Sequence, residues 1–273
     1  MPKISAESLQ TLTSGIRAIA TEAAEGILAV YGTDFSVEQK DDQSPLTAAD
    51  MTAHNTICTG LARLTPDIPV LSEESSAIPF AERRRWTQYW LVDPLDGTRE
   101  FIKKNGEFTV NIALIDHNEP VLGVIHIPVS GIGYFAVRGK GAYKCIPGNT
   151  PQSICVKTTT SDKITLAGSR SHGNKMQQAF IQRLGEDIEV IAIGSSLKFC
   201  LVAEGRVDIY PRFGPTSEWD SAAAQCIVEA AGGIVTDTVL RPLRYNTKDS
   251  LLNPSFLVIA DRSFDWLQYL PED

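Results

Sequence analysis

Two clusters of acidic side chains, each at the end of a short apolar run, are the residues best suited to do chemistry in this sequence. Glu73 and Glu74 form the first cluster, and Asp93 and Asp96 lie in the second, which reads Asp-Pro-Leu-Asp-Gly-Thr. If the two runs are adjacent strands that end together, these carboxylates meet at one edge of a sheet. Carboxylates packed that closely repel unless a cation lies among them. Oxygen ligands without His or Cys favour Mg²⁺, so phosphoryl chemistry is the first hypothesis.

The segment 93–98 also has the composition of a β-turn, with Asp first, Pro second and Gly soon after. A turn explains most of its residues, but it does not explain two acids at the end of an apolar strand with a second acidic pair nearby. In such a turn Asp93 and Asp96 can face one ion, while the Leu95 carbonyl offers a neutral oxygen. We therefore interpret the segment as a metal-binding turn.

Thr98 follows these acids and has two candidate roles. Its side chain could cap the short segment 99–103, or its hydroxyl could orient a metal-bound water for attack on phosphorus. The backbone N–H groups of Gly97 and Thr98 at a helix start are also suited to hold a phosphate. With the acids beside it, we expect Thr98 to have both roles.

Two further acids, Asp50 and Asp220, are ambiguous from the residues alone. Asp50 lies on an expected helix, where a solvated polar face explains it at least as well as a functional role does. Asp220 lies in the first turn of another expected helix, where an acid is favourable by about 0.3–1 kcal/mol. Alternatively, Asp220 is the ligand that closes the metal site from the second half of the chain. Its spacing does not decide between these two explanations.

Two polar segments, Gly-Ser-Ser-Leu-Lys at 194–198 and Ser-Arg-Ser-His at 169–172, each follow an expected strand and open an expected helix. Small hydroxyl residues with one base at such a junction suit a second phosphate. Loop capping explains both segments about equally well.

The expected secondary structure changes character along the chain. Two long amphipathic helices precede a series of hairpins, and beyond about residue 160 strands and helices alternate. This pattern predicts an α+β half over residues 1–150, with the helix pair on one face of an antiparallel sheet, and an α/β half over 151–273 with a mixed or parallel sheet. The expected helices cover 6–31, 45–64, 175–184, 197–204 and 219–231, and the hairpin strands cover 108–115, 121–127 and 133–137.

Composition limits the class of partner and the compartment. The chain has 273 residues, and 25 basic against 33 acidic residues give a net charge of −8. No basic excess exists to bind a nucleic acid polymer, but a small phosphorylated substrate remains compatible because Mg²⁺ can supply positive charge. Five scattered cysteines, no apolar signal core and no membrane-length apolar run predict a cytoplasmic protein without an integral membrane segment. Peripheral association with the cytoplasmic face of the inner membrane is compatible with the same features.

The acidic pair after a strand, Asp-Pro-Leu-Asp-Gly-Thr at 93–98 and Trp-Asp-Ser-Ala-Ala at 219–223 together resemble the inositol monophosphatase superfamily over essentially the whole chain. That superfamily comprises magnesium-dependent, lithium-sensitive phosphatases, and the resemblance implies an α-β-α-β-α layered sandwich of mixed α+β and α/β character. Segments 194–199 and 210–220 resemble its CysQ-type branch, the 3′(2′),5′-bisphosphate nucleotidases of sulfur metabolism. This implies conversion of adenosine 3′,5′-bisphosphate to AMP and phosphate.

The resemblance also implies roles for individual residues. Two or three Mg²⁺ ions would be held, with Asp93 between two of them, by Glu73, Asp93, the Leu95 carbonyl, Asp96 and Asp220. Asp50 would pair with Thr98, and these two with Glu73 would position the nucleophilic water, which reverses the solvated interpretation of Asp50. The rest of the nucleotide would be bound by Ser195, Lys198 and Arg212. The phosphate being removed would lie among Glu73, Leu95, Asp96, Gly97, Thr98 and Asp220.

Alternative hypotheses remain at this stage. The same chemistry could act on an inositol monophosphate or a sugar bisphosphate. A non-catalytic nucleotide or metal sensor is a hypothesis from another class, disfavoured because every expected ligand is present. The sequence is compatible with a monomer or a homodimer.

Overall fold

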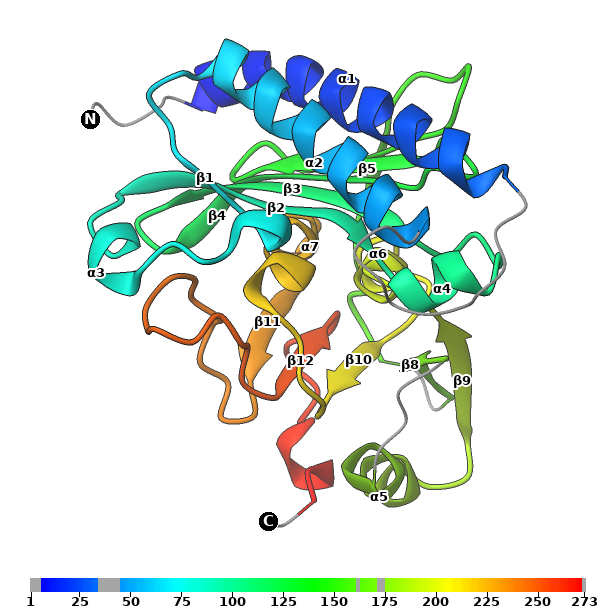
Figure 1. Cartoon of the computed structure of the whole chain (residues 1–273). Helices are drawn as coiled ribbons and strands as arrows, with labels where there is room; N and C mark the ends of the chain where they lie inside the picture. Colours follow the sequence, from blue (N-terminus) through cyan, green and yellow to red (C-terminus); the bar gives the residue numbers. More distant parts are fainter. Residues whose placement is uncertain (1–5, 34–44, 161–162, 171–174, 272–273) are drawn as a thin grey trace.

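The structure, a computed structural model, describes residues 6–33, 45–160, 163–170 and 175–271. A helix pair, a first sheet, a central helix layer, a second sheet and an outer helix follow one another in the order α-β-α-β-α (Figure 1). The layered sandwich expected from the sequence is therefore confirmed. None of the described helices combines the length and the apolar character needed to cross a membrane.

The helix pair covers one face of the first sheet. Helices α1 (Ala6–Tyr31) and α2 (Pro45–Leu64) have the bounds that their apolar periodicity predicts, and they pack against each other above the sheet (Figure 1). Ile16 and Ile27 of α1 and Ile57 and Leu61 of α2 are fully buried in the core shared with the sheet. Burial of these side chains, at roughly 1.5–3 kcal/mol each, fixes the helix pair over the strands.

The first sheet has the order β1-β2-β3-β4-β5-β6-β7, in which β1 and β2 are parallel and every other pair is antiparallel. The antiparallel hairpins predicted from the sequence are confirmed. The strands are β1 (Val70–Ser72), β2 (Gln88–Asp96), β3 (Thr109–Asp116), β4 (Glu119–His126), β5 (Gly133–Val137), β6 (Ala142–Cys145) and β7 (Gln152–Ile154).

The first hairpin connection is shorter than the five-residue link expected from the sequence. Strands β3 and β4 pair as far as Asp116 and Glu119, so only His117 and Asn118 turn the chain. Both have left-handed backbone angles, with φ of 50° and 65°. Two consecutive positive φ values define the type I′ turn that matches the twist of a two-residue hairpin.

The second sheet has the order β11-β12-β10-β8-β9 and mixed pairing, as predicted for an alternating segment. Its strands are β8 (Ile164–Ser169), β9 (Ile188–Ile193), β10 (Ile209–Arg212), β11 (Ile234–Asp237) and β12 (Phe256–Ile259). The associated helices are α5 (Lys175–Leu184), α6 (Leu197–Ala203) and α7 (Glu218–Ala230), and short helices occur at α3 (Phe80–Arg83) and α4 (Thr98–Ile102).

Helix α7 lies between the two sheets and packs against strands of both (Figure 1). Its approach to the first sheet requires a glycine at position 123, because a Cβ there would lie 2.3 Å from the carbonyl oxygen of Ala223. One core cluster contains Leu91 from the first sheet, Ala223 from α7 and Val258 from the second sheet. The two halves thus share a core, and the division at residue 150 stays a prediction; the first sheet itself ends at Ile154.

Candidate active site

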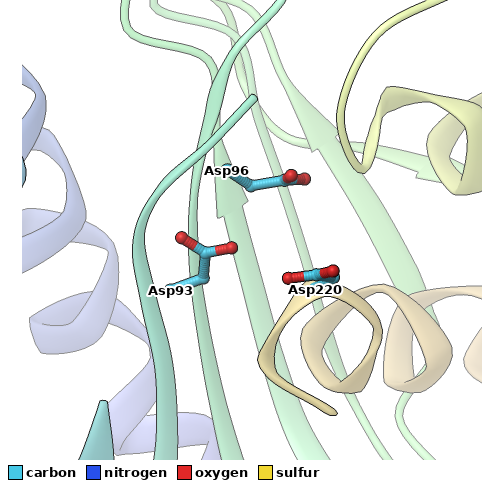
Figure 2. Close-up of side chains that lie close together, drawn as sticks. All are labelled: Asp93, Asp96 and Asp220. Carbon is cyan, nitrogen blue, oxygen red and sulfur yellow. The ribbon is translucent and has the colours of Figure 1, made fainter. Parts of the chain in front are cut away.

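Three carboxylates from two distant parts of the chain meet at the end of the first sheet. One oxygen of Asp93, one of Asp96 and one of Asp220 all lie within 4.8 Å of one another. Figure 2 shows Asp93 and Asp96 on the strand and Asp220 at the start of the facing helix, with the three groups around one space. The convergence expected from the sequence is therefore present for these three residues.

Strand register brings Glu73 to the same place. The parallel pair β1–β2 aligns Ser72 with Val92, so Glu73, which follows the end of β1, lies beside Asp93 of β2. Glu73 and Asp93 line the same cavity. The turn between Asp93 and Asp96 interrupts the register of β2 with β3, and there the backbone N–H of Leu95 donates to Asp93 Oδ1 at 3.1 Å.

Burial and mutual repulsion raise the pKa values of Asp93, Asp220 and Glu73. Desolvation, and then the neighbouring Glu73 and Asp96, raise the pKa of Asp93 well above its usual range. Desolvation with Asp96 raises the pKa of Asp220 to about 8, and desolvation with Glu74 raises the pKa of Glu73 to about 7. Such a group of acids is stable as carboxylates only with positive charge among them. Hard oxygen donors with no His or Cys in the group fit Mg²⁺.

Asp50 is not on a solvated face, so that interpretation is wrong. Its side chain on α2 is 8% exposed. Desolvation, followed by Glu74 and Glu73, raises the pKa of Asp50 to about 8. An acid buried beside two other acids is costly to the fold, which favours a functional role. Helix α2 also packs against α4, which begins at Thr98, although pairing of Asp50 with Thr98 stays a prediction.

Thr98 opens α4 but does not cap it, so the capping half of its expected role is wrong. Gly97 is the N-cap residue, and no side-chain cap bond is formed there. Gly97 has φ of 97°, and a Cβ at this position would lie 3.1 Å from the Glu107 carbonyl oxygen and 3.2 Å from Ser195 Cβ. The left-handed angle and the close approach of residue 195 therefore both favour glycine. Gly97 and Thr98 line the main cavity beside the carboxylates.

Asp220 lies in the first turn of a helix, as expected, and its role as a metal ligand stays a prediction. Its Oδ2 accepts a hydrogen bond from the backbone N–H of Ser217 at 2.9 Å, which forms half of a capping box at the start of α7. The same carboxyl group takes part in the three-residue cluster. A capped helix start fixes the direction of this side chain toward the first sheet.

A cavity of about 260 Å³ extends from the carboxylates toward the second sheet. Ser195, Lys198 and Arg212 line it, together with Ser169, while residues 171 and 172 of the other candidate segment lie outside the described residues. Lys198 is 6% exposed; burial lowers its pKa to about 8, and its ammonium donates to the Ser195 carbonyl at 2.6 Å.

Ser195 and Arg212 differ in how their polar atoms are used within the protein. Ser195 Oγ is bonded to Asp96 Oδ2 at 2.9 Å and lies 2.9 Å from Thr109 Oγ1. Arg212 donates from Nη2 to the Pro215 carbonyl, and its Nε has no hydrogen-bond partner among the described residues. The Arg212 Nε is therefore buried without a partner among the described residues, while the Ser195 hydroxyl is already engaged.

The structure adds contacts that the sequence reasoning did not assign, made by Asn111, by Glu107 and by Ser196 of the candidate segment 194–198. Ser196 and Asn111 both contact the Asp96 carboxylate, and Glu107 accepts a hydrogen bond from the backbone N–H of Gly194 at 2.8 Å. One signal was available for Asn111, which is the sole amide in the apolar run 108–115. A buried polar side chain inside such a strand needs a partner, and here that partner is at the site.

Comparison with known proteins gives one consistent result. The model of the inositol monophosphatase family matches residues 8–263. The 3′(2′),5′-bisphosphate nucleotidase CysQ of Escherichia coli strain K12 is 50% identical over 242 residues, which cover 88% of this chain and 96% of that protein. Its namesake from Aggregatibacter actinomycetemcomitans is 37% identical over 267 residues, covering 97% of each chain.

Solved structures agree with the sequence relatives. The crystal structure of CysQ from Bacteroides thetaiotaomicron, 43% identical, superimposes with a TM-score of 0.82 and covers 92% of this chain and 98% of that one. An inositol monophosphatase from Zymomonas mobilis, 25% identical, superimposes with a TM-score of 0.77 over 94% of this chain and 98% of that one. With the acidic cluster in place and these matches over nearly its full length, the chain belongs to the inositol monophosphatase family.

Proposed function

We propose that this protein is a Mg²⁺-dependent phosphomonoesterase, a 3′(2′),5′-bisphosphate nucleotidase that converts adenosine 3′,5′-bisphosphate to AMP and phosphate. The observation that carries the proposal is the Asp93–Asp96–Asp220 cluster at one end of a cavity whose wall also holds Lys198 and Arg212. An anionic substrate with two phosphates matches this distribution of charge, with one phosphate near each end. The CysQ relatives support the choice of a bisphosphate nucleotide.

The acidic residues would hold the cations. We propose two or three Mg²⁺ ions bound by the carboxylates of Glu73, Asp93, Asp96 and Asp220 and by the carbonyl of Leu95. When bound, Mg²⁺ supplies activation of a water and charge neutralisation on phosphate and leaving oxygens. Asp93, with its oxygen close to those of Asp96 and Asp220, is suited to the central place in that set.

The remaining residues orient the reacting groups. We assign the placement of the attacking water to Glu73, Asp50 and Thr98, which lie on three separate elements around the cluster. The backbone N–H groups of Gly97 and Thr98 at the start of α4 would bind non-bridging phosphate oxygens. The reaction is direct hydrolysis without a phosphoenzyme, because water positioned in line with phosphorus needs no protein nucleophile.

The second phosphate and the nucleoside would lie toward Lys198 and Arg212. Lys198 is held in place by its bond to the Ser195 carbonyl, so its charge is fixed at the cavity wall. Arg212 has an Nε without a partner within the described part of the chain. We include Ser195 as a substrate-binding residue because it lines the cavity. The same proposal places the enzyme in the cytoplasm. It is compatible with either a monomer or a homodimer.

A phosphate-release screen tests the proposal. Purified protein with Mg²⁺ should release phosphate from adenosine 3′,5′-bisphosphate faster than from inositol 1-phosphate or fructose 1,6-bisphosphate, and lithium should inhibit the reaction. Preference for inositol 1-phosphate or for the sugar bisphosphate would replace the nucleotidase assignment with those activities. Absence of release from all three substrates would favour a non-catalytic nucleotide or metal sensor.

A further inference from the structure

Ser196 contacts two of the acidic residues, one from each half of the chain. Its backbone N–H donates to Asp96 Oδ2 at 2.6 Å, and its hydroxyl lies 2.8 Å from the same oxygen. That hydroxyl also lies 2.8 Å from the backbone carbonyl oxygen of Asp220. Asn111 Nδ2 donates to the hydroxyl at 2.9 Å. With its side chain almost fully buried, Ser196 joins strand β2 to helix α7 at the metal centre.

The protein donors are concentrated on one oxygen of Asp96. Oδ2 accepts from the Ser196 N–H, from the Ser195 hydroxyl at 2.9 Å and, in part, from the Ser196 hydroxyl, with Asn111 Nδ2 at 3.5 Å. A carboxylate oxygen offers about two lone-pair sites, so these donors saturate Oδ2. The other oxygen, Oδ1, is thereby left for a cation, and the carboxylate cannot rotate without losing several hydrogen bonds.

Helix capping does not explain this arrangement. Ser196 is the N-cap residue of α6, yet its side chain makes no cap hydrogen bond to that helix. Its hydroxyl is directed to Asp96 and Asp220 instead. The preceding Ser195 has a left-handed backbone with φ of 54°, an uncommon angle for a residue with a side chain. Such strain is retained where neighbouring contacts require it, and here those contacts are with Asp96 and Thr109.

We infer that Ser196 is a positioning residue for the metal centre, which sets cation affinity by fixing the Asp96 carboxylate relative to Asp220. Ser195 and Asn111 assist it. The inference rests on the metal-dependent function proposed above. It adds the residue that sets the cation affinity of the acidic cluster. Partners that orient metal ligands typically account for 10- to 100-fold of affinity.

The test is direct measurement of Mg²⁺ binding by calorimetry, without substrate. Ser196→Ala should bind Mg²⁺ about 10- to 100-fold more weakly than the wild type. The matched control is Thr165→Val, which also removes a hydroxyl bonded to a buried aspartate, Asp208, at 2.7 Å, but in the second sheet and outside the acidic cluster. Thr165→Val should bind Mg²⁺ as the wild type does.

A second readout separates positioning from a general structural role. The activity of Ser196→Ala should return to within a few-fold of wild type at saturating Mg²⁺, because the ligands themselves remain. If Ser196→Ala does not fold, Ser195→Ala removes a single donor from a half-buried side chain and should weaken Mg²⁺ binding in the same direction.

Three outcomes overturn the inference. In the first, Ser196→Ala binds Mg²⁺ as tightly as the wild type. In the second, Ser195→Ala, used if Ser196→Ala does not fold, binds Mg²⁺ as tightly as the wild type. In the third, Thr165→Val loses as much Mg²⁺ affinity as Ser196→Ala. A wild-type protein that binds no divalent cation would instead refute the proposed function, and this inference with it, so the two failures are distinguishable.

Discussion

Replacing Asp93 with Asn should stabilise the metal-free protein while it abolishes function. Asp93 is 1% exposed, and its ligand oxygen lies within 4.8 Å of those of Asp96 and Asp220. Asn has nearly the same shape, and it can still accept the hydrogen bond that the Leu95 N–H gives to Oδ1. The substitution therefore removes one negative charge with little change in packing.

The size of the effect follows from the distance between the charges. Two unit charges 4.8 Å apart repel by about 3.5 kcal/mol at an effective dielectric constant of about 20, so two neighbours contribute about 7 kcal/mol. Protonating a carboxylate of ordinary pKa near pH 7 costs about 4 kcal/mol. Protonating one carboxylate costs less than keeping all three charged, so we expect the metal-free cluster to take up a proton. The cluster then lowers the free energy of unfolding by at most about the cost of that protonation. Asp93→Asn should recover roughly 1–4 kcal/mol of it.

Urea unfolding in EDTA and in saturating Mg²⁺ measures this prediction. In EDTA, Asp93→Asn should have the higher unfolding free energy. In saturating Mg²⁺ the order should reverse, because a ligand at about 1,000 times its Kd stabilises the wild type by about 4.1 kcal/mol, more than the variant gains in EDTA, and the variant lacks one of the proposed ligands. Turnover should fall by several orders of magnitude, since the cations supply several kcal/mol of transition-state stabilisation.

The matched control is Asp208→Asn in the second sheet. Asp208 is also fully buried, but its Oδ2 is bonded to Lys157 Nζ at 3.0 Å and to the Thr165 N–H at 2.8 Å. Removing this paired charge should destabilise the protein in EDTA and leave the Mg²⁺ effect intact. The reasoning is refuted if Asp93→Asn is less stable than the wild type in EDTA, or if it gains as much from Mg²⁺.

Three further predictions concern the pocket, the water and pH. Lys198→Ala should lower kcat/KM for adenosine 3′,5′-bisphosphate about 10- to 100-fold, the value of a hydrogen bond to a charged group, with little change for inositol 1-phosphate; an unchanged ratio of the two contradicts the second-phosphate assignment. Thr98→Ala should lower kcat at least about 100-fold with unchanged Mg²⁺ affinity in calorimetry, because it orients water without binding metal; unaltered turnover would remove it from the mechanism. The free energy of unfolding in EDTA should fall as pH rises from about 4 to about 8. Asp50 and Asp220 have folded-state pKa values raised from 3.8 to about 8. Across that pH range the folded state therefore holds protons that the unfolded state has lost. A denaturation series across that range with rising or constant stability would contradict the clustering.

The sequence predicted the parts of the site that depend on local pattern. Apolar runs that end in acids placed Glu73 and Asp93 at neighbouring strand ends, and the observed pairing of Ser72 with Val92 is the register that this requires. The bounds of α1 and α2 followed from apolar spacing together with glycine, cap and proline signals at the helix ends. For the helices the deciding interactions lie within a few residues along the chain, so the sequence pattern indicates them.

Features that depend on tertiary packing were not predictable in the same way. Nothing in the periodicity of α2 indicates that Asp50 faces Glu73 rather than water; the burial comes from the contact of α2 with the sheet edge. Position 97 favours glycine in part because residue 195 approaches it, a contact across nearly a hundred positions. Only the family resemblance indicated a role for Asp50, and the polar segment 194–198 marked Ser196 as a candidate without indicating its contacts with Asp96 and Asp220.

The way the site is assembled links cation binding to the junction of the two sheets. Asp93 and Asp96 belong to the first sheet, whereas Asp220 is on α7, which packs between the sheets. Ser196 joins Asp96 to the Asp220 carbonyl. A cation shared by these carboxylates can bind tightly only where α7 and residues 194–196 are seated on the first sheet. By linkage, the free energy of cation binding stabilises this packed arrangement relative to any state in which the two halves separate. Mg²⁺ should therefore increase the stability of the junction between the sheets more than that of either sheet.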